Sequence, residues 1–136
     1  MKRLSLLTAL AALMTVGAAW AQPPAGPQLG NPASLRCIES GGMVRIETRP
    51  DGGQYGICVF ADNRQCEEWA MFRGQCPAGG LRITGYVTRP ARYCAITGGR
   101  YAVVANSGTE HEQGACTLPS GTVCDAGAYF AGRCGP

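Results

Sequence analysis

Short apolar stretches separated by turn signals dominate the hydrophobic pattern of this chain. They predict a helix over residues 33–40, strands at residues 43–46 and 55–60, and a second helix over residues 67–73. Asn31 suits the N-cap of the first helix, with Pro32 in its first turn, and Gly74 ends the second helix. The pattern therefore predicts a helix, a two-stranded hairpin, a tight turn at residues 61–63 and a second helix.

The same arrangement returns later in the chain. The segments Cys58–Cys76 and Cys116–Cys134 each carry three cysteines, separated by seven and then nine residues. Cys94 matches Cys37 at an offset of 57, and one inserted residue in the hairpin turn makes the later offset 58. Shared spacings and glycines indicate an internal duplication. The predicted fold class is small disulfide-rich α+β, with two tandem helix–hairpin–helix units.

The chain opens with the features of a secretory signal. Lys2 and Arg3 precede an apolar run over residues 4–19, and residues 19–21 form a small-x-small cleavage site. We therefore expect a periplasmic or secreted protein with no transmembrane segment after signal removal. The expected divisions are a signal peptide at 1–21, a flexible tail at 22–30, a first repeat at 31–76, a linker at 77–88 and a second repeat at 89–136.

The charge balance excludes several classes of partner. Removing Lys2 and Arg3 from the twelve basic residues leaves ten arginines against nine acidic residues, a net charge of +1. Nucleic-acid binding needs a clustered basic face, which this balance does not supply. We therefore expect neither nucleic acid nor a polybasic membrane contact. The expected partner is a protein or another component of the cell envelope.

The cysteines indicate a disulfide framework. An even number of cysteines in a small exported chain is typical of such frameworks. Zinc sites usually carry Cys-x-x-Cys pairs, and this chain has none, so we expect no metal and no cofactor. The eight residues expected to form disulfides are Cys37, Cys58, Cys66, Cys76, Cys94, Cys116, Cys124 and Cys134.

Helix geometry narrows the pairing of these cysteines. Four cysteines per unit allow three pairings. If one helix separated Cys66 from Cys76, their distance would be roughly 15 Å, beyond the ~7 Å that a disulfide spans. The same argument excludes Cys124–Cys134 in the second unit. One of the three pairings is thus excluded in each unit, and two remain open. We favour Cys37–Cys76 with Cys58–Cys66, and their equivalents Cys94–Cys134 with Cys116–Cys124, because Cys58 and Cys66 flank the turn symmetrically.

Candidate catalytic groups are few. His111 is the single histidine and lies in the expected hairpin loop of the second unit, where a solvated side chain is the favoured interpretation. Glu67 and Glu68 are adjacent, so on a helix they point about 100° apart and do not share a site. The dipole at the start of a helix explains acidic residues there. Since no hydrolase, metalloprotease or nucleotide-binding motif is present, we expect no enzyme and no catalytic residue.

Trp69 and Phe72 lie three residues apart on one face of the predicted second helix. Core packing against the hairpin is the favoured interpretation of both. The second unit has Gly127 at the position of Trp69 and an alanine at the position of Arg73. Because that unit is expected to fold without them, Trp69 and Arg73 are also candidates for a partner-binding surface.

The motifs of the first unit resemble those of a known bacterial family. They are Asn-Pro-Ala-Ser at 31–34 with Cys37, Gly-Gly at 41–42, Gly-x-Cys-x-Phe at 56–60, Asp62, and Cys-Glu-Glu-Trp-Ala-x-Phe-Arg-Gly-x-Cys at 66–76. This set is similar to the bacterial domain of unknown function three hundred and thirty-three, whose members are small exported proteins often labelled hemolysins. The second unit keeps the cysteines and glycines and resembles a diverged second copy.

The resemblance implies an exported, disulfide-stabilised fold and supplies no mechanism. We expect a non-catalytic binding or structural module. A protease inhibitor-like domain is the alternative, because the turn at residues 59–65 is framed by cysteines and resembles an inhibitory loop. Membrane lysis, which the hemolysin label implies, is less favoured, because no long amphipathic helix or basic patch is present.

Overall fold

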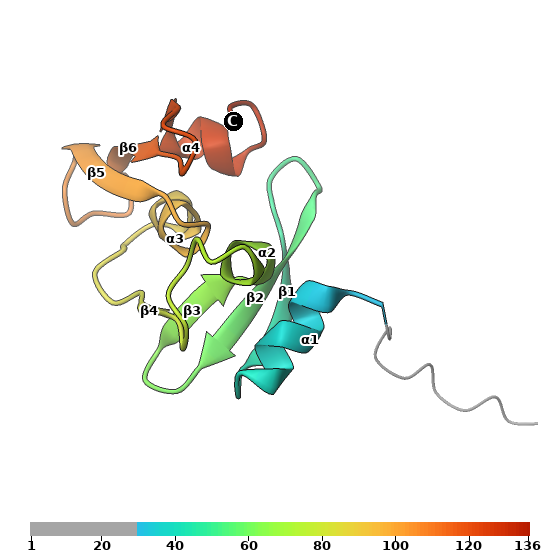
Figure 1. Ribbon diagram of the computed structural model, residues 1–136. Coiled ribbons are helices and arrows are strands. Elements are labelled where there is room, and N and C mark those ends of the chain that lie inside the picture. Colours follow the sequence, from blue (N-terminus) through green and yellow to red (C-terminus); the bar gives the residue numbers. More distant parts are fainter. Residues whose placement is uncertain (1–29) are drawn as a thin grey trace, which may run out of the picture.

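Two small sheets, each flanked by helices, form the protein (Figure 1). The computed structural model describes residues 30–136, so the predicted signal peptide and residues 22–29 of the predicted tail lie outside the described part. Within the described residues, the predicted disulfide-rich α+β class is confirmed. Two similar units follow one another along the chain.

Antiparallel strands in sequential order form the sheet of each unit. The first unit contains α1 (Pro32–Glu39), β1 (Met43–Thr48), β2 (Gln54–Phe60), β3 (Arg64–Glu67) and α2 (Glu68–Phe72), and β4 (Leu81–Arg82) of the linker extends its sheet. The second unit contains α3 (Arg89–Ile96), β5 (Arg100–Ala105), β6 (Gln113–Thr117), β7 (Val123–Asp125) and α4 (Ala126–Phe130). The elements of the second unit therefore repeat those of the first.

The third strand of each sheet departs from the predicted helix–hairpin–helix unit. Asp62 and Asn63 have φ angles of 59° and 57°. Consecutive left-handed residues form the tight turns that join antiparallel strands. The chain therefore continues as β3, paired with β2, before it enters a helix. The turn at residues 61–63 lies where it was predicted, but α2 spans five residues instead of residues 67–73.

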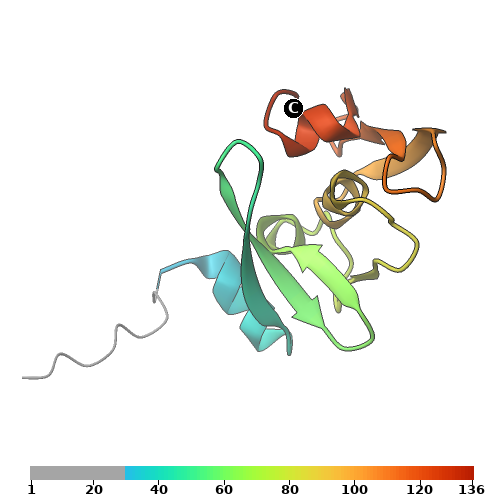
Figure 2. The same ribbon diagram turned by 180° about the vertical axis from the view of Figure 1, so that it is seen from behind.

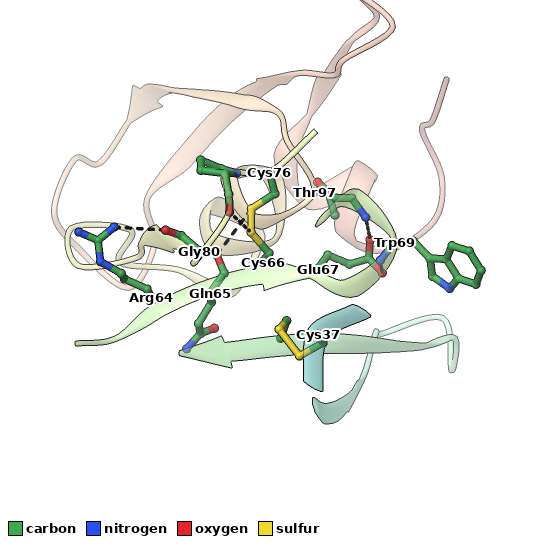
Figure 3. The surroundings of a disulfide bond; sticks show 12 residues. Cys37, Arg64, Gln65, Cys66, Glu67, Trp69, Cys76, Gly80 and Thr97 are labelled. Atoms are coloured by element: carbon green, nitrogen blue, oxygen red, sulfur yellow. Dashed lines mark hydrogen bonds between the residues drawn. A yellow bond between two sulfur atoms is a disulfide. The ribbon is translucent and has the colours of Figure 1, made fainter. Parts of the chain in front are cut away.

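The disulfide pairs are the same in both units and differ from the favoured pairing. Cys37 bonds to Cys58 and Cys66 bonds to Cys76, with Cα–Cα distances of 5.6 and 5.9 Å (Figure 3). The second unit contains the equivalent bonds Cys94–Cys116 and Cys124–Cys134. All eight cysteines are bonded, as predicted. The preferred pairs Cys37–Cys76, Cys58–Cys66, Cys94–Cys134 and Cys116–Cys124 are wrong.

The geometric exclusion of Cys66–Cys76 failed because no single helix separates these residues. Cys66 lies in β3, and the short helix α2 follows it. Gly74, with a φ of 72°, then turns the chain back after the helix end. Cys58 and Cys66 do lie opposite each other in the β2–β3 register. Their side chains nevertheless bond to partners outside that strand pair, so two disulfides lie side by side in the core.

An apolar cluster that is separate from the disulfide-containing core of each unit joins the two units. Ile57 of β2, Ile83 of the linker and Ile96 of α3 pack together and are buried. Because side chains alternate along a strand, Cys58 faces the core of its own unit while Ile57 faces α3. In both views α3 lies between the first sheet and the strands of the second unit (Figures 1 and 2). The units therefore stack head to tail.

The two units differ where they meet. Ile96 of α3 is buried, whereas its equivalent in α1 at an offset of 57, Glu39, is exposed. The covered face of β2 carries Ile57, and its equivalent at an offset of 58 is Ala115. Apolar residues therefore occur where the helix of one unit and the sheet of the other face each other. The equivalent helix and strand that do not face another unit carry a charged or a smaller residue instead.

Candidate functional site

A cleft of about 860 Å³ opens between the two units. Ligand-binding pockets typically measure about 300–1,000 Å³. Its walls come from the β1–β2 hairpin and α2 of the first unit, and from α3, α4 and the β6–β7 loop of the second. Its charged and aromatic side chains include Arg49, Trp69, Arg73, Tyr93 and Tyr129. The cleft is therefore a feature of the paired units and belongs to neither alone.

Trp69 and Arg73, the two residues predicted for a partner surface, both line this cleft. The Trp69 side chain is 38% exposed and packs edge-on against Phe72, with ring centroids 5.6 Å apart. Figure 3 shows the indole ring directed away from the disulfides. Phe72 is 47% exposed, so the interpretation of both rings as core residues is wrong. Arg73 Nε donates to Gln75 Oε1 at 3.1 Å, which holds the guanidinium beside the cleft.

Glu67 is the N-cap of α2 and is buried. Its carboxylate oxygens accept hydrogen bonds from the backbone N–H groups of Trp69 and Ala70 at 3.1 and 2.7 Å. Burial raises the pKa of the Glu67 carboxyl above its ordinary value, and these two hydrogen bonds act in the opposite direction. The acidic residue predicted to favour the helix start is thus a direct cap, which fixes the backbone that carries Trp69.

Glu68 links the two helices of the first unit. Asn31 Nδ2 donates to its Oε1 at 2.9 Å, and Ser34 Oγ donates to its Oε2 at 2.6 Å. Asn31 also caps α1, as predicted, by accepting hydrogen bonds from the N–H groups of Ala33 and Ser34. Gly56 passes directly behind this carboxylate, where any Cβ would collide with it. The role of Glu68 is therefore a buried hydrogen-bonded connection, beyond the helix-dipole effect.

Arg49 connects the two walls of the cleft. Its Nη2 lies 3.1 Å from Asp51 Oδ2, and its Nη1 donates to the hydroxyl of Tyr93 in the second unit at 3.4 Å. The hydrogen bond with Tyr93 is the largest of the effects that raise the pKa of Arg49. Its Nε is buried and finds no hydrogen-bond acceptor within residues 30–136. The guanidinium is thus held between the hairpin and α3.

Aromatic rings from both units pack together at the cleft. Tyr55 and Tyr93 meet edge-on with centroids 5.0 Å apart, and Tyr93 lies 5.1 Å from Tyr129. The hydroxyl of Tyr55 donates to Glu47 Oε2 at 2.9 Å. Burial first, and this hydrogen bond second, raise the pKa of Tyr55 to about 12. Burial likewise raises the pKa of Tyr93, so both phenols are neutral at physiological pH.

Comparison with known proteins gives the same division into two units. A family described as a domain of unknown function (DUF333) matches residues 28–75 and again residues 89–133, more than half of the chain. The chain belongs to this family. No curated protein and no solved structure matches it. Each DUF333 match contains one helix–sheet–helix unit, and β4 of the linker lies between the two matches.

The second DUF333 unit replaces the whole Glu68 network. Thr88, Ala91 and Ala126 occupy the positions equivalent to Asn31, Ser34 and Glu68. Tyr101 fills the corresponding space, because a Cβ on Gly114 would meet its ring, and its hydroxyl donates to Glu112 Oε1 at 3.0 Å. The three polar partners of the first unit are therefore absent together, as expected for groups that satisfy one another in a buried network.

The remaining candidate residue lies apart from the cleft. His111 is in the β5–β6 loop and exposed, as predicted, and its Nε2 lies 3.5 Å from Glu110 Oε1.

Within residues 30–136, no group of three or more His, Cys, Asp and Glu side chains could hold a metal ion. None of the helices in this range is long and apolar enough to cross a membrane.

The sequence interpretation found one wall of the cleft and missed the other. Arg49, Tyr93 and Tyr129 carry no local motif, and Tyr93 and Tyr129 approach Trp69 only because the two DUF333 units stack. One signal for the Glu68 network was available in the sequence. Aligning the two copies shows that Ser34 and Glu68 are both replaced by alanine in the second unit.

Proposed function

We propose that this protein is an exported, non-catalytic binding module and that the cleft between its DUF333 units is the ligand site. The position of Trp69 carries the proposal: the fold leaves a large indole exposed in the wall of a cleft, beside Arg73. Trp and Arg are enriched among the residues that dominate binding energy. The second unit has Gly127 and Ala131 at these positions, so this scaffold forms without either side chain.

The chemistry of the cleft supports binding over catalysis. The carboxylate of Glu67 is occupied by two backbone N–H groups, and that of Glu68 by Asn31 and Ser34. A general base needs a carboxylate free to accept a proton from the substrate. The same internal hydrogen bonds hold the walls of the cleft in place, and such preorganisation lowers the entropic cost of binding.

Export is the second part of the proposal. Disulfides persist in oxidising compartments, and this chain holds four of them. The predicted signal peptide would direct the chain to the periplasm or the medium. Fractionation of cells that express the full chain, followed by N-terminal sequencing, tests this location. A product that begins at Gln22 in an exported fraction supports it, and an uncleaved chain with reduced cysteines in the cytosol contradicts it.

The inhibitor alternative finds less support. A segment that binds a protease by strand addition lies extended. Asp62 and Asn63 at the tip of the cysteine-framed turn are left-handed instead. Hemolytic activity is motivated by the family label alone and stays a prediction.

Ligand retention by immobilised chains tests the binding site. We expect the double variant Trp69→Ala, Arg73→Ala to retain at least about tenfold less of the specific partner in an envelope extract than the wild type, since losses at such residues reach about 2 kcal/mol or more. Ile38→Ala is the matched control, because Ile38 is 55% exposed and lies outside the cleft. Equal retention by all three chains, with unchanged melting temperatures, would contradict the proposal.

A further inference from the structure

The ligand chemistry of the cleft follows from its charged and aromatic side chains. Arg49 and Arg73 face it together with Glu67 and Glu68, so the formal charges cancel. Each of these groups is already held inside the protein: Arg49 by Asp51 and Tyr93, Arg73 by Gln75, and the two carboxylates by hydrogen-bond donors. A ligand that complements this cleft therefore carries no net charge.

Rings and amides make up much of the remaining surface. Trp69 and Tyr129 contribute partly exposed aromatic rings and Tyr93 a buried one, and Gln54 and Gln75 contribute side-chain amides. Aromatic-lined grooves with hydrogen-bonding groups recognise proline-rich segments in the polyproline II conformation. Such segments bind at low entropic cost, because proline fixes their backbone before binding. The cleft thus fits an uncharged, proline-rich peptide.

The chain contains a segment with this chemistry. Residues 22–29 read Gln-Pro-Pro-Ala-Gly-Pro-Gln-Leu, with three prolines and no charged side chain. In the polyproline II conformation, eight residues would span about 25 Å at ~3.1 Å per residue.

The segment also joins the described structure at the edge of the cleft. Asn31 follows it almost directly, and its side chain donates to Glu68, which lines the cleft next to Trp69. Gly30, between the segment and this anchor, is exposed. The chain therefore enters the first unit at a residue that is hydrogen-bonded to the cleft wall.

We propose that residues 22–29 bind in the cleft between the two units, so that the chain carries its own tethered proline-rich ligand. This inference rests on the proposed function, because it assigns an occupant to the same site. A short tether gives an effective concentration of about millimolar. An external peptide of the same chemistry therefore has to compete with residues 22–29 before it can bind.

Trp69 supplies the reporter, because the only other tryptophan, Trp20, lies in the predicted signal peptide. The experiment compares acrylamide quenching of Trp69 fluorescence in the exported full chain and in a variant from which residues 23–29 are deleted. The deletion leaves the predicted cleavage site and every described hydrogen bond in place. We expect the quenching constant to rise at least about twofold, because removing a bound segment exposes the indole.

A synthetic peptide of residues 22–30 provides the second arm. We expect it to reverse the change in the deletion variant saturably, and to act at least about tenfold more weakly on the full chain, where the tether competes. A peptide with alanine at all three prolines is the control ligand, and Val104→Ala, an exposed site outside the cleft, is the control variant. Tyr129→Ala in the deletion variant should weaken binding of the native peptide.

The outcomes separate this inference from the proposed function. If acrylamide quenches both chains equally and the peptide does not bind saturably, residues 22–29 are not a tethered ligand. The retention experiment tests the cleft as a partner site independently of this result. A full chain that dimerises when the deletion variant does not also overturns it, because the segment then occupies a second copy. If the tethered ligand is correct, the deletion variant should retain more envelope partner than the full chain.

Discussion

The hydroxyl of Ser34 donates a hydrogen bond to Glu68 Oε2 at 2.6 Å and joins the start of α1 to the start of α2. Asn31 completes the connection from the other side of the carboxylate. Glu68 is 4% exposed, so these donors replace the water that the carboxylate loses on folding. The Asn-Pro-Ala-Ser motif and the Glu-Glu-Trp motif, although far apart in sequence, thus meet at one buried group.

Breaking this bond should destabilise the first unit. We expect Ser34→Ala to lower the free energy of unfolding by about 1–3 kcal/mol, because it leaves a buried carboxylate oxygen without its donor. Ser34→Ala and Glu68→Ala together should cost less than the sum of the single changes, since the second unit has alanine at both positions. Urea denaturation with intact disulfides measures all three. Ser107→Ala in the exposed β5–β6 loop is the control, and strictly additive effects would contradict the coupling.

The observed disulfide pattern makes a prediction for peptide mapping. Digestion without reduction should release linked peptides that contain Cys66 with Cys76 and Cys37 with Cys58. Replacing both Cys66 and Cys76 by serine should lower stability by about 3 kcal/mol, from the loop-closure entropy of a short loop. A linked peptide that joins Cys58 to Cys66 would contradict the pairing.

The raised pKa of Tyr55 predicts loss of stability at alkaline pH. Its folded pKa of about 12 lies above the ordinary 10.0. Folding therefore favours the neutral phenol, so this contribution is complete below pH 10 and is lost between pH 10 and about 12. Tyr55→Phe should reduce the fall in stability over this range and remove one late component of the tyrosinate absorbance titration. An unchanged titration curve in Tyr55→Phe would show that Tyr55 ionises normally.

The interface between the units predicts that a change in one unit affects the other. Ile96 is 2% exposed and contacts Ile57 and Ile83 outside its own unit. Ile96→Ala should cost about 2–5 kcal/mol, as for other buried large-to-small changes. It should also speed amide hydrogen exchange in β2 of the first unit. Val104→Ala, at a site 71% exposed, should change stability by less than about 0.5 kcal/mol. If Ile96→Ala speeds amide hydrogen exchange only in the second unit, the two units are independent.

Local features could be predicted because their causes lie within a few residues. Asn31 was predicted as an N-cap, and its side chain accepts from the N–H groups of Ala33 and Ser34. The turn at residues 61–63 was predicted from Asp and Asn, which tolerate left-handed angles. The duplication and the participation of every cysteine followed from spacing and even number alone.

The stacking of the units was not predictable from one unit's pattern. Ile57 and Cys58 are both apolar residues of one strand, and no local feature says that Ile57 will face another unit. The signal lies in the comparison of copies: Ile96 is apolar where it is covered, and its equivalent Glu39 is charged where it is exposed. Terminal units of stacked repeats carry polar outer faces for this reason.

By itself, the sequence determined the Asn31 cap, the tight turn at residues 61–63 and the participation of every cysteine in disulfides, because those depend on short-range backbone geometry and on counting. Only the tertiary structure decided which cysteines pair, because β3 and Gly74 bring Cys66 and Cys76 within 5.9 Å between their Cα atoms. It also decided that Trp69 faces a cleft, since the opposite wall of that cleft comes from the second unit. Both outcomes depend on where distant segments lie in space, which no local pattern of residues records.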